Sequence, residues 1–185
     1  MKKEYTHFVF VLDRSGSMAQ DIKETLQGIE GFINKNKIPG KQCTYSLYSF
    51  SDELLTHSTF SNINDYKTPL IEADGMTALF DSFVISIDKT GESLAQMQEK
   101  DRPEKVIVVT LTDGGENSSK NFKSNHVKSR IEEQKNKYGW EFIFLGADFS
   151  IDSYAQDFGL TKGTSRNISK AQIAYDLSSV GASVS

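Results

Sequence analysis

Four short apolar segments predict the strands of this chain. They are residues 7–12, 45–50, 105–111 and 140–146, and each is rich in β-branched or aromatic side chains and bounded by charged or turn-forming residues. Three of them, 7–12, 105–111 and 140–146, are apolar at nearly every position, which is typical of parallel strands covered on both faces. Such strands require helices above and below the sheet.

Helical periodicity occupies the stretches between these segments. Residues 18–34 carry apolar side chains at spacings of four, three and four, and residues 77–98 and 122–138 repeat the pattern, the latter more sparsely. Residues 170–184 predict a closing helix. Because strands alternate with helices, we expect an α/β fold with a doubly wound, mostly parallel central sheet and helices on both faces.

A polar region interrupts this alternation between residues 50 and 74. The periodicity fades there into Ser, Asn, Asp and Thr, except at residues 54–59, which predict an edge strand followed by a long loop. No internal repeat or linker divides the chain, and 185 residues suit one domain. We therefore expect residues 1–185 to form a single domain.

Composition and charge narrow the classes of partner. A net charge of −4 gives no basic field for nucleic acid or for an anionic membrane surface. Cys43 is the only cysteine, so no intramolecular disulfide is possible. The apolar stretch 8–12 is too short for the core of a signal peptide, and no run approaches the roughly 18 to 20 apolar residues of a membrane span. We expect a cytoplasmic protein without nucleic-acid or membrane partners.

The turn after the first strand reads Asp13-Arg14-Ser15-Gly16-Ser17 and crowds a carboxylate with two hydroxyls. In open parallel sheets, ligands bind beyond the carboxyl ends of the strands. Hard oxygen donors suit magnesium, calcium or manganese and disfavour zinc or copper. The turn is therefore a candidate cation site.

Two further turns supply oxygen ligands to the same edge. Asp113 follows the strand 105–111, and Thr77 stands at the start of the helix 77–98. Together with the first turn they provide three hydroxyls and two carboxylates, a set that describes an octahedral hard-cation site completed by water. Asp74 and Glu116 lie near this edge and are candidates for outer-shell charge.

These residues resemble the metal-ion-dependent adhesion site of von Willebrand factor type A domains. The matching motifs are Asp13-x-Ser15-x-Ser17, Thr77 and Thr112-Asp113-Gly114, and the tail 174–181 is similar to that of stand-alone prokaryotic or phage members. The resemblance implies that Ser15, Ser17 and Thr77 bind a divalent metal, magnesium first. It implies that Asp13 and Asp113 act directly or through water, with one position open for an Asp or Glu of a partner protein.

Each turn by itself has a simpler explanation. Ser17 and Thr77 suit helix caps, Asp113-Gly114 suits an ordinary turn, and Asp81 suits the first turn of a helix, so Asp81 is left out of the site. The three histidines show no metal-ligand spacing. Only the combination of the three motifs favours a metal.

Three functions remain open from the sequence. The first is a metal-dependent protein-binding module, without catalysis, that presents the cation at the carboxyl edge of the sheet. The second is a metal-dependent enzyme acting on a phosphate-bearing substrate, for which Glu116 or Asp74 would have to serve as the general base. The third is a structural or assembly protein that the metal braces.

Overall fold

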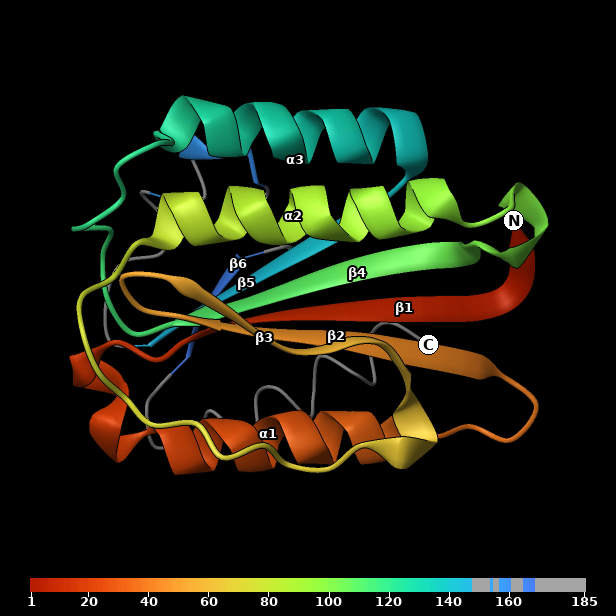
Figure 1. Ribbon diagram of the computed structural model, residues 1–185, viewed down its shortest axis with the longest axis horizontal. Coiled ribbons are helices and arrows are strands. Elements are labelled where there is room, and N and C mark those ends of the chain that lie inside the picture. The colour runs from red at the N-terminus through yellow and green to blue at the C-terminus, as the bar shows by residue number, and fades with distance from the viewer. Residues whose placement is uncertain (148–153, 155–156, 161–164, 169–185) are drawn as a thin grey trace.

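The computed structural model is built on a six-stranded sheet with the order β3-β2-β1-β4-β5-β6 (Figure 1). It describes residues 1–147, 154, 157–160 and 165–168. The strands are β1 (Lys2–Asp13), β2 (Gln42–Phe50), β3 (Leu54–Asn62), β4 (Pro103–Thr112), β5 (Glu141–Ala147) and β6 (Ser165–Ile168). The α-helices are α1 (Ile22–Lys35), α2 (Leu79–Gln96) and α3 (Ser124–Tyr138). Short 3-10 helices span Gly16–Gln20, Ile63–Asp65 and Glu99–Asp101.

Strand direction agrees with the apolar patterning. β1 runs parallel to β2 and β4, β4 to β5, and β5 to β6, whereas β3 is antiparallel to β2 and ends one side of the described sheet. The predictions of a mostly parallel sheet and of an edge strand after residue 50 are both confirmed. The closing helix predicted at residues 170–184 lies outside the described residues.

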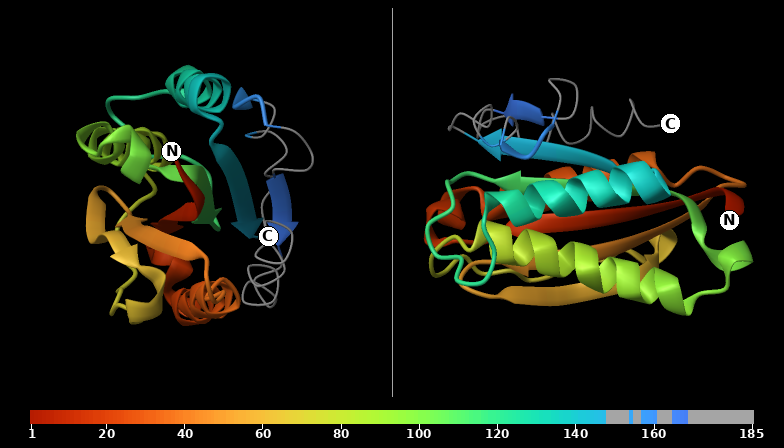
Figure 2. Two further views of the ribbon diagram at one scale, coloured as in Figure 1. Left: turned by 90° about the vertical axis from the view of Figure 1, so that its right-hand side faces the viewer. Right: turned by 90° about the horizontal axis from the view of Figure 1, so that it is seen from above.

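Alternate residues of β1 feed two separate cores. Phe8, Phe10 and Leu12 pack with α1 on one face of the sheet, and Val9 and Val11 pack with α2 and α3 on the other. This alternation follows from the two-residue period of a strand. The left view of Figure 2 shows the sheet as a middle layer between α1 on one face and α2 and α3 on the other. The predicted three-layer α/β arrangement is confirmed, and none of the described helices is long and apolar enough to cross a membrane.

The first helix begins later than its apolar periodicity predicts. α1 starts at Ile22, and Gly16–Gln20 instead form a 3-10 turn. The N–H of Met18 donates to the carbonyl of Ser15, and the N–H of Asp21 donates to the carbonyl of Met18. These bonds span three residues rather than four, so the segment that carries Ser17 is wound more tightly than an α-helix.

The second helix is also shorter than predicted, because Thr77 bonds to another loop. Its N–H donates to the side-chain carbonyl of Asn117 and its carbonyl accepts from the N–H of Asn117, so α2 begins only at Leu79. Thr77 therefore belongs to the loop that leads into α2.

The strand order places the polar turns at one edge of the sheet. β1 leads through α1 to β2 on one side and pairs with β4 on the other. The winding of the chain thus reverses between β1 and β4, where open α/β sheets form their ligand crevice. Leu12 pairs with Leu111 in the register, so Asp13 and Thr112 follow side by side.

Candidate metal centre

Asp13 lies at the bottom of the candidate centre. It is fully buried, and its carboxylate accepts hydrogen bonds from the N–H of Ser15 at 2.7 Å and from the hydroxyl of Thr112 at 2.6 Å. Ser15 and Thr112 are also buried. Two protein donors thus hold the carboxylate in one orientation.

Ser17 connects the turn after β1 to the turn after β4. The hydroxyl of Ser17 lies 3.1 Å from that of Ser15 and donates a 2.7 Å hydrogen bond to Oδ1 of Asp113. Asp113 is buried, whereas Ser17 is exposed. Four of the predicted oxygen ligands are therefore gathered in one place, and the Ser17 side of that place faces solvent.

Thr77 completes the group from the third loop. A Cβ added at Gly114 would lie 3.8 Å from the hydroxyl oxygen of Thr77 and 3.9 Å from that of Ser17, so both hydroxyls face the same small space. Thr77 is buried, and its bonds to Asn117 fix its backbone. The structure thus brings together all five residues that the sequence predicts as ligands.

Backbone hydrogen bonds join the loops around this space. The N–H of Gly16 donates to the carbonyl of Gly75 at 3.0 Å, and the N–H of Asp74 donates to the carbonyl of Arg14 at 2.8 Å. The N–H of Arg14 in turn donates to the carbonyl of Phe50 at the end of β2. These hydrogen bonds link the loops that carry the predicted ligands.

The negative charges of the two carboxylates favour a bound cation. Burial raises the pKa of Asp13, hydrogen bonds from Thr112 and Ser15 lower it, and the negative charge of Asp113 raises it again; the net pKa is above its ordinary value. Burial makes the charged form costly, and a like charge nearby adds to that cost. A cation held between the two carboxylates would offset both effects.

The donor set fits a hard divalent cation. It consists of three neutral hydroxyls and two carboxylates, the oxygen ligands that magnesium, calcium and manganese prefer. Over the described part of the chain, no cluster of three or more His, Cys, Asp or Glu side chains is placed to hold a metal. The candidate centre is of a different kind, because hydroxyls form more than half of it.

The carboxylates of the two outer-shell candidates accept hydrogen bonds from nearby backbone and hydroxyl groups. Asp74 is exposed, and its Oδ1 accepts the N–H of Gly75 at 2.8 Å. The carboxylate of Glu116 accepts the N–H of Phe80 at the start of α2, and it accepts further bonds from Ser118 and Ser119. Glu116 thus ties its loop to the N-terminus of α2, and an outer-shell role for either residue stays a prediction.

Two structural residues beside the centre have no distinctive sequence signal. Asn117 holds the backbone of Thr77, but the polar residues around Asn117 in the sequence do not predict that contact. Asp81 accepts the N–H groups of Lys120, Asn121 and Phe122. Burial raises the pKa of Asp81, but these N–H donors outweigh it, and the net pKa is lowered. Its carboxylate therefore shapes the loop before α3.

Comparison with protein families gives one match over most of the chain. The model of the von Willebrand factor type A domain matches residues 8–178. No curated protein sequence matches the chain.

Several solved structures have the same fold as this chain. The chain is similar to a von Willebrand factor type A protein of Catenulispora acidiphila, with a TM-score of 0.69, 14% identity, and coverage of 96% of this chain and 42% of that one. Proximal thread matrix protein 1 of the mussel byssus matches with a TM-score of 0.64 and 18% identity, and the match covers 96% of this chain and 45% of that one. The manganese-loaded TRAP protein of Plasmodium vivax matches with a TM-score of 0.64 and 12% identity, and the match covers 95% of this chain and 72% of that one. The chain spans less than half the length of the first two, and identities this low establish the fold alone.

Proposed function

The chain belongs to the von Willebrand factor type A domain family, and from this premise we propose that it is a metal-dependent protein-binding module. It presents a divalent cation, magnesium first, to an acidic side chain of a partner protein. The observation that supports this most directly is the convergence of Ser17, Thr77 and Asp113 on one small space that is open beside Ser17. Members of this family often bind a metal and mediate protein interactions, and the TRAP neighbour was solved with manganese.

The residues divide into ligands and supports. Ser15, Ser17 and Thr77 would hold the ion through their hydroxyls, and Asp13 and Asp113 would supply negative charge directly or through water. Because three of these five groups are neutral, the bound ion would remain electrophilic toward a further carboxylate. Thr112 and Asn117 would keep Asp13 and Thr77 in position through their hydrogen bonds.

Two structural features favour binding over the alternatives. Backbone bonds such as Gly16 to Gly75 join the loops directly, which favours a metal that binds a partner over one that only braces the loops. An enzyme would need a general base near the ion, but the carboxylate of Glu116 is occupied by backbone and hydroxyl donors. Asp74 is exposed, and its carboxylate accepts the N–H of Gly75.

The proposal is tested by metal-dependent capture of a partner. The immobilised protein is exposed to an extract of its source cells in magnesium and then washed with EDTA, beside an Asp13→Asn column. A partner that elutes with EDTA and is missing from the variant column is expected. Replacing the partner's acidic residues one at a time by alanine should abolish binding at a single position. Capture that survives both EDTA and Asp13→Asn would overturn the proposal, and magnesium-dependent phosphate release would favour the enzyme instead.

A further inference from the structure

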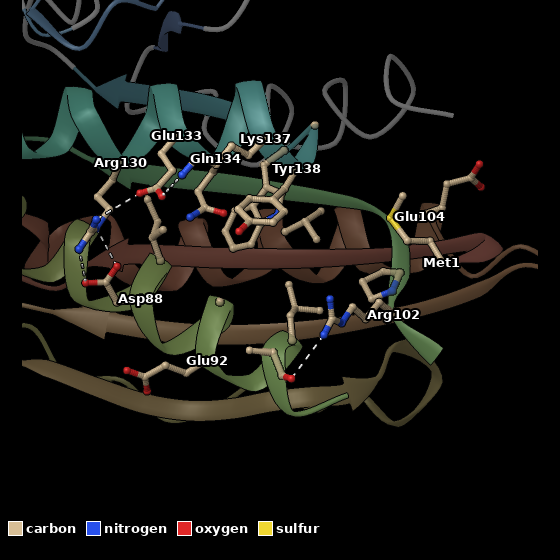
Figure 3. A pocket seen from close by; sticks show the side chains of 18 of the residues that line it. Met1, Asp88, Glu92, Arg102, Glu104, Arg130, Glu133, Gln134, Lys137 and Tyr138 are labelled. Carbon is tan, nitrogen blue, oxygen red and sulfur yellow. Dashed lines mark hydrogen bonds and ion pairs between the residues drawn. The ribbon is translucent and has the colours of Figure 1, made fainter. Parts of the chain in front are cut away.

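A groove between α2 and α3 lies at the opposite end of the molecule from the candidate metal centre. It encloses about 960 Å³, near the upper end of the range for ligand pockets. Its walls come from the C-terminal halves of both helices and from the start of β4. Figure 3 shows Asp88 with Arg130 at one end of the groove and Met1 with Glu104 at the other.

The floor of the groove is apolar and two large apolar side chains stand at its rim. Leu94, Val106 and Trp140 are buried residues of the floor. Met1 and Tyr138 line the groove and are 65% and 59% exposed, which places them among the few large hydrophobic residues that face solvent in the described structure. Exposed apolar surface next to an apolar hollow is typical of an interaction site.

Small residues on α2 leave the space that forms the groove. Gly91 and Ala95 both line it and lie one helical turn apart. A Cβ added at Gly91 would meet no atom within 4 Å. A stripe of small residues lets another helix approach the backbone closely, with its side chains between those of α2 and α3.

The rim of the groove carries acidic side chains that are not neutralised by ion pairs within the protein. Five acidic residues line the groove against three arginines and lysines and the N-terminal ammonium of Met1. Arg130 pairs with Asp88 at 2.9 Å and with Glu133, and Lys137 also pairs with Glu133. No cation lies within ion-pair distance of Glu92 or Glu99 among the described residues.

Helix ends increase the negative potential at this groove. Both α2 and α3 place their C-terminal turns here, and the last carbonyls of a helix carry partial negative charge, which Lys135 and Lys137 in the last turn of α3 offset in part. The guanidinium of Arg102 donates to the carbonyls of Ala95 and Met97, so its charge offsets part of the dipole of α2 and is turned toward the protein. The surface that remains is apolar in the middle and negative at the margin.

From this complementarity we propose that the groove between α2 and α3 is a docking site for a basic amphipathic helix of a partner protein. The apolar side of that helix packs on Trp140 and beside Gly91, and its lysines or arginines face Glu92 and Glu99. This contact is separate from the metal centre and needs no metal.

The test uses the full chain and a defined probe. The probe is a peptide of about 15 leucine and lysine residues with leucines at helical spacing, and its counterpart carries glutamate in place of lysine. Trp140 is the only tryptophan of the chain, so its fluorescence reports on the groove directly. We expect the lysine peptide to shift this fluorescence saturably at one peptide per chain, equally in magnesium, in EDTA and with the Asp13→Asn variant. The glutamate peptide should give no shift.

Matched variants separate the groove from general attraction to an acidic protein. Gly91→Leu places a large side chain where an added Cβ meets no atom within 4 Å and should weaken binding of the lysine peptide about tenfold. Gln96→Leu, on an exposed position of the same helix outside the groove, should leave binding unchanged. The pair Glu92→Gln with Glu99→Gln should weaken binding more than the pair Glu24→Gln with Glu72→Gln. Equal binding to all variants, or no saturable shift, would overturn the proposal. A dimer of the chain that Gly91→Leu dissociates would overturn it too, because a second copy would then occupy the groove.

Discussion

The hydroxyl of Ser17 donates a 2.7 Å hydrogen bond to Oδ1 of Asp113, across 96 positions of sequence. This bond joins the turn after β1 to the turn after β4, which are neighbours because the two strands pair in the sheet. It holds a neutral and a charged oxygen together at the solvent-facing side of the candidate centre. The first two predictions concern this centre.

The Asp13→Asn variant should fold normally and lose metal binding. Thr112 can accept from the new amide and donate instead to the carbonyl of Gly114, 3.0 Å from its hydroxyl. In a thermal melt with magnesium at about one hundred times its dissociation constant, the unmodified protein should gain roughly 5–10 °C. The variant should show no gain, and isothermal titration should show no heat of binding. A magnesium-dependent gain in the variant would contradict the proposed role of Asp13.

Gly114→Ala should weaken metal binding without changing the fold. The new methyl group would lie at ordinary contact distance, 3.8 Å from the Thr77 hydroxyl oxygen and 3.9 Å from the Ser17 hydroxyl oxygen, within the space assigned to the ion. We expect magnesium affinity to fall about tenfold or more by isothermal titration. The control is Gly91→Ala, where the added methyl meets nothing within 4 Å. Unchanged affinity in Gly114→Ala would place the ion elsewhere.

Asp81→Asn should destabilise the protein by about 1–3 kcal/mol, because an amide nitrogen cannot accept the N–H groups that this carboxylate now binds. The bonds at stake run from Lys120, Asn121 and Phe122. Urea unfolding at neutral pH measures the change in free energy. Asp101→Asn, on an exposed residue before β4, is the control and should change stability by less than about 0.5 kcal/mol. Equal effects of the two substitutions would show that Asp81 does not support the loop.

His7 should make the protein sensitive to mild acid. The ring is fully buried, stacks on Phe60 with centroids 3.7 Å apart, and lies 2.8 Å from the hydroxyl of Thr44 and 3.1 Å from that of Ser46. Burial lowers the pKa of His7 to about 3. The unfolded chain has a histidine pKa near 6.5, so between these values only the unfolded state binds the proton.

Stability from neutral His7 is therefore complete above about pH 6.5 and is lost as the pH falls toward 3, by about 1.4 kcal/mol per pH unit. The His7→Gln variant removes this contribution to the slope. Urea unfolding of both proteins at pH 7.5 and 4.5 gives the test, with the pair at pH 7.5 as the control for any direct effect of the substitution. The same loss of stability on acidification in both proteins would assign the acid sensitivity to other groups.

Several features of this protein follow from its sequence alone. Uninterrupted apolar runs predict β1, β4 and β5 as buried parallel strands, because only a strand with helices on both faces keeps such a run from water. The polar residues after β1 and β4 then fall at one edge of the sheet, which is why Asp13, Ser15, Ser17 and Asp113 are predicted as neighbours. The turn before α2 adds Thr77, which stands at the start of a predicted helix, and the structure gathers it with the other four.

Only the tertiary structure decides the contacts between distant loops. The sequence gives no sign that Asn117 holds Thr77, that Glu116 bonds to the start of α2, or that Asp81 binds the loop before α3. These bonds join residues 36 to 41 positions apart, and any polar side chain in a loop has many partners within reach in the unfolded chain. The groove beside Gly91 likewise depends on how α2 and α3 pack over the sheet. Local patterning determines the strands and the order of the ligands, and the packing of the chain determines which loop atoms meet.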